Sequence, residues 1–165
     1  MAFWILVLSY WLHLLATVVW LGGLALMVLI ALPAWRQGTL AANHWLALQQ
    51  RFMPWANGSL VVLLITGFIQ MTNDPNYSGF LAVDSLWAWA ILVKHLTFFG
   101  MVAISGYTQF YLYPSMRRLS LLAETRPQRA AVEQERLNRR EMRLLRLNLF
   151  CAAAILLLTA TATAV

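Results

Sequence analysis

Charged residues and cysteines are scarce in this 165-residue chain. Only 11% of its residues are charged and 61% are hydrophobic, whereas a soluble globular domain has about 25% charged and about 45–50% apolar residues. A water-soluble enzyme domain is therefore excluded. The single cysteine, Cys151, excludes an intrachain disulfide, a zinc knuckle and a covalent haem attachment motif. The sequence also lacks a nucleotide-binding glycine loop, a GxSxG elbow and an HExxH zinc motif, so it has no standard catalytic signature.

What the chain has instead is four long apolar runs. They cover about residues 3–32, 55–72, 86–113 and 147–165, and runs of about 18 or more apolar residues indicate membrane-spanning helices. The first run would be about 45 Å long at ~1.5 Å per residue, more than the ~30 Å hydrocarbon core, so this helix should tilt or protrude. The runs predict an all-α integral membrane protein in which residues 1–165 form a single four-transmembrane-helix bundle.

Arginines lie in two of the three predicted loops. The segment 115–146 holds nine arginines and four glutamates, a formal charge of nine minus four, or +5. The first loop contains Arg36 and Arg51, whereas the charged residues of the loop between the second and third spans are Asp74 and Asp84. The positive-inside rule therefore predicts that both basic loops are cytoplasmic and both termini extracytoplasmic. We expect a multi-pass protein of a bacterial-type inner (cytoplasmic) membrane.

The net charge of +6 is concentrated in the basic segment 115–146. Such a juxtamembrane cluster is typical of a topology signal that also attracts anionic lipid headgroups, so we expect a lipid bilayer and no nucleic acid as a partner. Residues 130–147 alternate charges with Val132, Leu137, Leu144 and Leu145. This pattern predicts an interfacial or partner-binding helix that leads into the last span.

Three ionisable residues lie inside the predicted spans: His13, Lys94 and His95. Such residues are costly in a bilayer and are candidates for function. The first and third spans both enter from the outside, near residues 3 and 86, so His13 and His95 are each about nine or ten residues deep. At ~1.5 Å per residue both imidazoles lie roughly 13–15 Å below the outer boundary. The two histidines can therefore share one level of the bundle.

Two imidazoles at one depth suggest a b-type haem whose iron has a histidine at each axial position. With both positions filled, electron transfer is favoured over oxygen chemistry. Helical spacing places Tyr10 and Trp20 on the His13 face and Phe99 on the His95 face, beside small residues that leave room for a flat guest. Lys94 could meet a propionate. The leading hypothesis is therefore an electron carrier or accessory subunit rather than a stand-alone enzyme, working with partner membrane subunits, a quinone or a cytochrome.

Two other readings use the same histidines differently. Neutral imidazole also suits copper, so His13 and His95 could hold copper in a transport or homeostasis protein. Alternatively, the chain is a cofactor-free structural accessory subunit in which both histidines are hydrogen-bonded core residues. The seven methionines show no MxxM-type cluster that would indicate a thioether path for Cu(I).

Residues 13–24, HLLATVVWLGGL, contain a histidine, a tryptophan seven residues later and then two glycines. This stretch resembles the first helix of the CopD-type copper-resistance membrane domain. The stretch from Trp89 to Lys94, continued by an apolar helix to Pro114, resembles the same family's later Trp–Lys helix. The resemblance implies a four-span layout, copper handling, and functional roles for His13, Trp20 and Lys94.

The related HemJ-type protoporphyrinogen oxidases share this general arrangement, with a first-helix histidine associated with b haem and a later lysine. Their pattern has an arginine and a further histidine after the first-helix glycines. Residues 25–33 here contain neither. We therefore do not expect porphyrinogen oxidation. Full-length CopD proteins are longer than this chain, which would correspond to their core domain.

Overall fold

The computed structural model describes residues 3–77, 79, 85–122 and 127–164, and these residues are almost entirely helical. Asp84, Glu124 and Arg126, which entered the predicted loop charges, lie outside the described residues. Four continuous helices are long and apolar enough to cross a membrane, over Phe3–Arg36, His44–Thr72, Leu86–Leu119 and Gln128–Ala164. The predicted all-α fold with four membrane-spanning helices is confirmed, and the chain is a multi-pass membrane protein.

The four long helices are divided into six α-helices and two π-helical segments. The first contains α1 (Phe3–Leu26), η1 (Met27–Ala31) and α2 (Leu32–Arg36), and the second is α3 (Ala42–Thr72). The third contains α4 (Leu86–Tyr107), η2 (Thr108–Leu112) and α5 (Tyr113–Leu122), and the fourth is α6 (Pro127–Ala164). Both π-helical segments pack against α6.

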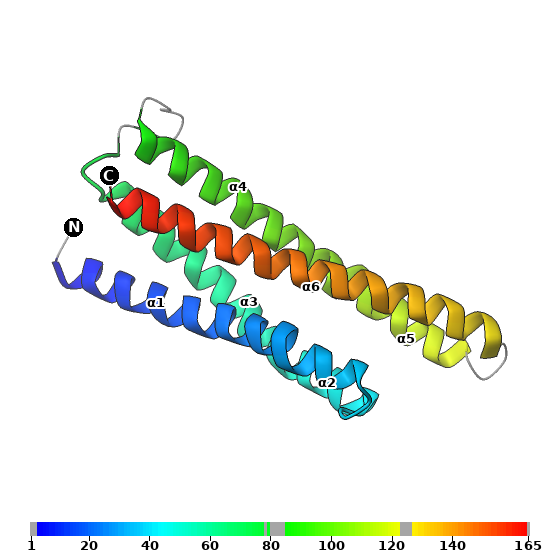
Figure 1. The fold of residues 1–165 in the computed structure, drawn as a ribbon. Coiled ribbons are helices and arrows are strands. Elements are labelled where there is room, and N and C mark those ends of the chain that lie inside the picture. The colour runs from blue at the N-terminus through cyan, green and yellow to red at the C-terminus, as the bar shows by residue number, and fades with distance from the viewer. Residues whose placement is uncertain (1–2, 78, 80–84, 123–126, 165) are drawn as a thin grey trace.

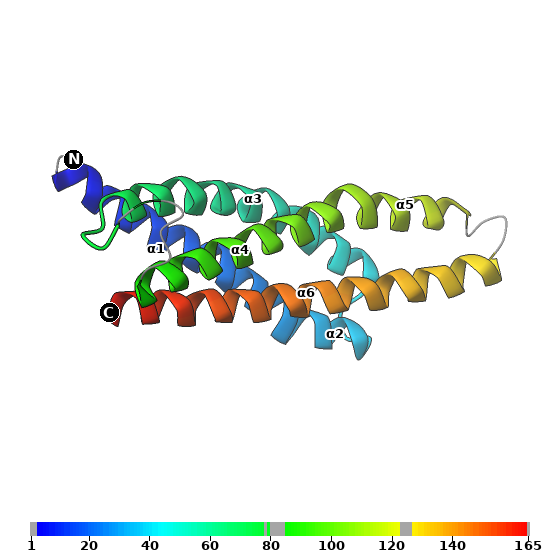
Figure 2. The same ribbon diagram turned by 90° about the horizontal axis from the view of Figure 1, so that it is seen from above.

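The helices form two antiparallel pairs. α1 packs mainly along α3, and α4 packs mainly along α6 (Figure 1). Both termini lie at the same end of the bundle in both views (Figure 2). At the opposite end, α5 and the first half of α6 extend beyond the α1–α3 pair. The parallel helices α1, with His13, and α4, with His95, therefore belong to different pairs.

The second helix begins at Ala42, well before the predicted start of the span at residue 55. Residues 45–52 are too polar for a hydropathy window, but their inward positions follow helical spacing. Trp45 and Gln49 are buried, and Leu48 and Phe52 pack against the same core cluster. Pro54 lies inside α3 without ending it. The predicted span missed residues 42–54 because the burial of these residues depends on packing against other helices, whereas the prediction used apolar length.

The part of the basic segment from residue 127 to residue 146 forms one helix with the last span, α6, which runs from Pro127 to Ala164. The predicted helix over residues 130–147 is confirmed, and it runs into the span without a break. One of its charges is not a surface group: Glu141 is fully buried and accepts a hydrogen bond from the side chain of Gln49. The end of the bundle opposite the termini therefore contains a buried polar contact between α3 and α6.

The central core lies where all four long helices meet. Trp20, Leu24 and Val28 from the first helix pack with Leu60 of α3, Met101 of α4 and Ala152 of α6. A second contact joins α1 to α3, because Gly23 has no side chain and the ring of Phe52 occupies the space where a β-carbon would project. These contacts fix the depth of α1 relative to α3 and thereby the position of His13.

Candidate functional site

A cavity of about 360 Å³ lies between the four long helices. His13, Lys94 and His95 all line it, although they come from helices of different pairs. Asp74, Trp87 and Thr163 line its outer part, so it reaches toward the end of the bundle at which both termini lie (Figure 1). The three ionisable residues singled out within the spans thus share one internal space.

Thr66 of α3 holds the ring of His13. The hydroxyl of Thr66 donates to the carbonyl of Val62 at 2.6 Å and lies 2.7 Å from Nδ1 of His13. Because a hydroxyl has one proton, Thr66 must accept the second hydrogen bond from Nδ1–H. The lone pair of His13 is then on Nε2, as a metal ligand requires.

His95 is held within its own helix. Its Nδ1 lies 2.7 Å from the carbonyl oxygen of Ile91, one turn earlier. A carbonyl can only accept, so Nδ1 carries the proton and Nε2 carries the lone pair. The ring also lies against Phe68, with centroids 5.6 Å apart. Both histidines therefore have the same tautomer, and both rings line the same cavity.

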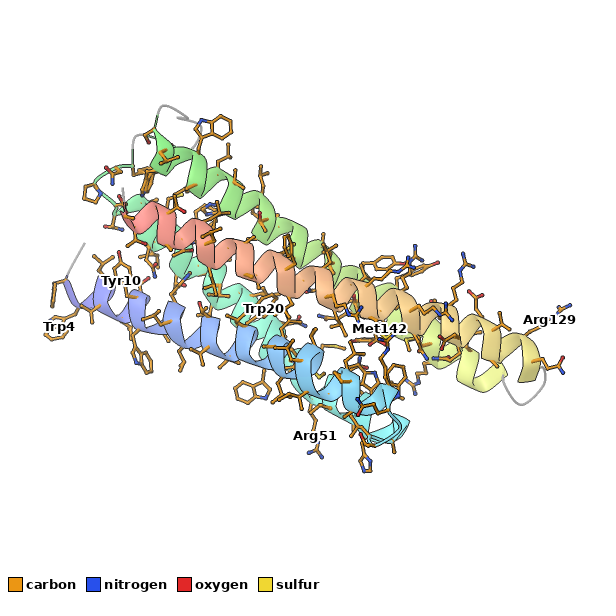
Figure 3. The ribbon with its side chains drawn as sticks, in the orientation of Figure 1. Trp4, Tyr10, Trp20, Arg51, Arg129 and Met142 are labelled. Atoms are coloured by element: carbon orange, nitrogen blue, oxygen red, sulfur yellow. The ribbon has the colours of Figure 1, made fainter. Side chains whose placement is uncertain are left out.

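The other predicted site residues divide between the cavity and the outer surface. Tyr10 and Trp20 line the cavity with His13, and Figure 3 shows both along α1. Lys94 also lines it and lies within electrostatic range of His13. Phe99 is not among the residues that line the cavity, and 49% of its surface is exposed. The i+4 spacing from His95, which predicts a shared helix face, does not bring Phe99 to the cavity.

Two methionines that were not predicted as site residues also line the cavity. Met71 of α3 and Met101 of α4 are buried and line the cavity with the histidines. Met101 is seven residues after Lys94, a helical spacing that could have indicated a shared face. The described residues contain no group of three or more His, Cys, Asp or Glu side chains that could hold a metal ion. Met71 and Met101 offer thioether sulfur atoms in the same lining as the two imidazoles.

The chain is similar to known copper proteins. Residues 46–162 match the family model "Copper resistance protein D". The copper transport protein CutJ of Bacillus subtilis (strain 168) is 32% identical over 124 residues, which make up 70% of this chain. The matched segment is 20% of that relative, so the chain corresponds to about a fifth of its length. No solved structure matches the chain.

These similarities overturn the leading functional prediction. Haem b binding and electron transfer are wrong as the main interpretation, because the family and the relative both concern copper. The physical reason for the error is that imidazole is an equally ordinary ligand for haem iron and for copper. The equal depth of the two histidines predicted a shared site but could not distinguish haem iron from copper. The expected partner subunits, quinone or cytochrome are not tested by the similarities and stay predictions.

The family match begins at residue 46 and so includes α4 with Lys94 and His95 but not α1. The first-helix stretch that carries the predicted CopD resemblance lies before it. His13 and Trp20 lie outside the matched segment, and both line the cavity. α1 supplies one of the two imidazoles, and α3 supplies the hydroxyl that orients it.

Proposed function

Since the chain belongs to the copper resistance protein D family, we propose that it is a membrane protein of copper transport or homeostasis whose cargo binds in the cavity. His13 and His95 are the proposed copper ligands. The observation that carries the proposal is that two imidazoles of the same tautomer line one internal space together with two thioethers. The name of the relative supports transport as the process.

The chemistry of the lining side chains favours Cu(I). Thioether sulfur is a soft ligand that selects Cu(I), and imidazole binds copper well. Met71 and Met101 supply the sulfur atoms and His13 and His95 the nitrogen atoms. Tyr10 and Trp20 form part of the wall. We propose no role in the cavity for Phe99.

Lys94 gives the site a property that suits cargo rather than a permanent cofactor. Its ammonium lines the same cavity as the histidines, and a positive charge nearby weakens the binding of a cation by Coulomb repulsion. Transport requires a site that binds strongly enough to fill and weakly enough to empty. We propose that Lys94 keeps copper affinity in this range, and that Lys94→Leu, which removes the charge without adding a sulfur ligand, tightens binding.

The finer location follows from the charge distribution. We propose that the chain forms a single membrane domain in a bacterial-type inner membrane with both termini outside, because the basic segments lie at the opposite end of the bundle. The cavity then lies in the outer half of the membrane. Copper would enter it from the extracytoplasmic side.

The test is Cu(I) binding by the detergent-purified protein, measured by competition with a chromophoric Cu(I) chelator. The wild type should bind one Cu(I) per chain, and His13→Ala and His95→Ala should each weaken binding by about 10- to 100-fold. His44→Ala is the matched control, since it removes the third imidazole of the chain from the exposed first turn of α3. Met71→Leu and Met101→Leu should weaken Cu(I) binding while leaving the fold intact, because leucine has a similar volume.

A wild-type protein that does not bind Cu(I) would overturn the proposal. Equal losses in the His44→Ala control and in the cavity variants would move the site out of the cavity. Transport itself is tested by Cu(I) uptake into proteoliposomes, where the cavity variants should be slower than the control.

A further inference from the structure

A second hollow lies far from the copper cavity, between α5 and α6. It is a groove of about 770 Å³ at the end of the bundle away from the termini. Five arginines line it, Arg118 from α5 and four from α6: Arg136, Arg139, Arg140 and Arg143. The carboxylate that lines it is Glu133. The groove thus has a formal charge of five minus one, or +4.

The positive charge is only partly balanced within the chain. Arg139 donates to Glu135 at 2.8 Å, and Arg136 lies 3.8 Å from Glu133. Among the described residues, no carboxylate forms an ion pair with Arg118, Arg140 or Arg143. Three guanidinium groups around one hollow repel one another unless an anion lies between them. The planar, multiply donating guanidinium group suits phosphate oxygens in particular.

Aromatic contacts hold part of this groove in place. The guanidinium carbon of Arg140 lies 5.5 Å from the ring centroid of Tyr107, and that ring stacks on Tyr111 at 5.2 Å. Tyr111 also lines the groove. Arg140 is therefore oriented by a cation–π contact before any anion binds.

Apolar side chains adjoin the arginines on the side of the membrane span. On α6, Leu147 and Phe150 follow Arg143 by four and seven residues and so continue its face. They are 48% and 72% exposed, and Phe110 of η2 is 83% exposed. A soluble phosphate would use only the arginines, whereas a phospholipid would place its phosphate in the groove and its acyl chains along this apolar surface.

We propose that the α5–α6 groove is a specific binding site for the headgroup of an anionic phospholipid. The phosphate lies among Arg118, Arg140 and Arg143, and the acyl chains lie against Leu147 and Phe150. This goes beyond a diffuse attraction of basic residues to the membrane surface, because it requires a saturable site with fixed partners. It does not depend on copper handling.

The test is native mass spectrometry of the delipidated full chain in detergent, titrated with phosphatidylglycerol or with phosphatidylcholine. The wild type should bind one phosphatidylglycerol at least about tenfold more tightly than phosphatidylcholine. The double variant Arg118→Gln/Arg143→Gln should lose about tenfold in affinity for phosphatidylglycerol. Arg51→Gln/Arg129→Gln is the matched control, since it removes the same charge from exposed positions outside the groove (Figure 3).

Equal losses in the groove variant and in the control would overturn the proposal in favour of diffuse surface charge. Inorganic phosphate that competes with phosphatidylglycerol at equal concentration would also overturn it, because the apolar surface would then add nothing. Both positions of the groove variant are exposed, so it should keep its helical circular dichroism and elute as a single species. A groove variant that binds phosphatidylglycerol like the wild type would place the lipid elsewhere.

Discussion

At the scale of single residues, the two cavity histidines are oriented by acceptors of different origin. The acceptor for His95 is a carbonyl of its own helix, at Ile91, whereas the acceptor for His13 is the hydroxyl of Thr66, 53 residues away on α3. A side-chain substitution can therefore remove the partner of His13 without touching the ring. Substitution of Thr66 therefore tests whether the orientation of the His13 ring matters for the proposed Cu(I) binding.

Replacement of Thr66 by valine should weaken Cu(I) binding by about 10- to 100-fold, the usual effect of losing the partner that orients a metal-binding histidine. Valine has nearly the shape of threonine but cannot accept a hydrogen bond from Nδ1–H of His13. The imidazole ring is then free to change its tautomer or to rotate. Chelator competition on the purified variant measures the loss. Thr66→Ser keeps the hydroxyl and should bind Cu(I) within about twofold of the wild type.

Equal losses of Cu(I) affinity in Thr66→Val and Thr66→Ser would contradict this prediction, because serine keeps the hydroxyl that accepts from His13. A loss in Thr66→Ser alone would instead point to packing of the methyl group, which valine keeps and serine lacks. Thermal unfolding of both variants checks that neither substitution destabilises the fold.

The residue scale also shows how much of the site the sequence could predict. His13, Lys94 and His95 were found because ionisable residues in apolar runs are rare and their depth can be counted along a helix. Met71, Met101 and Thr66 were not found, since these residue types are common in membrane helices. Their place at the cavity depends on how α3 is rotated against α1 and α4, and this rotation cannot be read from the pattern of residues along the chain.

At the scale of secondary structure elements, the contact between α1 and α3 depends on Gly23. A β-carbon at this position would overlap the ring of Phe52, whereas one at Gly22 would meet no atom within 4 Å. Gly23→Ala should destabilise the protein by about 1–3 kcal/mol, the usual range for overpacking a close contact. Gly22→Ala is the matched control and should leave the thermal unfolding midpoint in detergent unchanged or raise it, because alanine is the better helix former.

A second substitution separates this clash from other effects of alanine at position 23. Phe52→Ala destabilises the protein by itself, because it leaves a cavity. When Gly23→Ala is added to Phe52→Ala, it should cause no further destabilisation, because the ring that the β-carbon would overlap is absent. Equal destabilisation by Gly23→Ala with and without Phe52 would contradict a direct contact. The same double-variant comparison would report any shift of α1 through the Cu(I) affinity of His13.

The bounds of the elements show where sequence reasoning ends. Apolar length predicted four spans correctly, because the face of a helix that contacts lipid must be apolar whatever its neighbours are. It could not predict that α3 begins at Ala42. The early start of α6, at Pro127, was indicated by the pattern of charges and apolar residues over 130–147 and not by apolar length. These extensions lie at the end of the bundle away from the termini, where one face of each helix is polar. Their inner faces bury Trp45 and Glu141.

At the scale of the whole molecule, the charge distribution and the fold agree. Four crossings place both termini at one end, and the arginine groove lies at the other end (Figures 1 and 2). Asp74, near the end at which the termini lie, lines the cavity that contains the histidines. The cavity and the groove are thus separated along the long axis of the bundle. The orientation of the chain decides which side of the membrane each one faces.

Cysteine labelling in intact cells tests this orientation, because Cys151→Ser removes the only native thiol. In that background, Asn76→Cys reports on the loop beside the cavity, and Arg129→Cys reports on the far end of α6. The positive-inside rule predicts that a membrane-impermeant maleimide labels Asn76→Cys directly and labels Arg129→Cys only after permeabilisation. The reverse pattern would open the cavity toward the cytoplasm, contradict entry of copper from outside, and place the phospholipid groove in the outer leaflet.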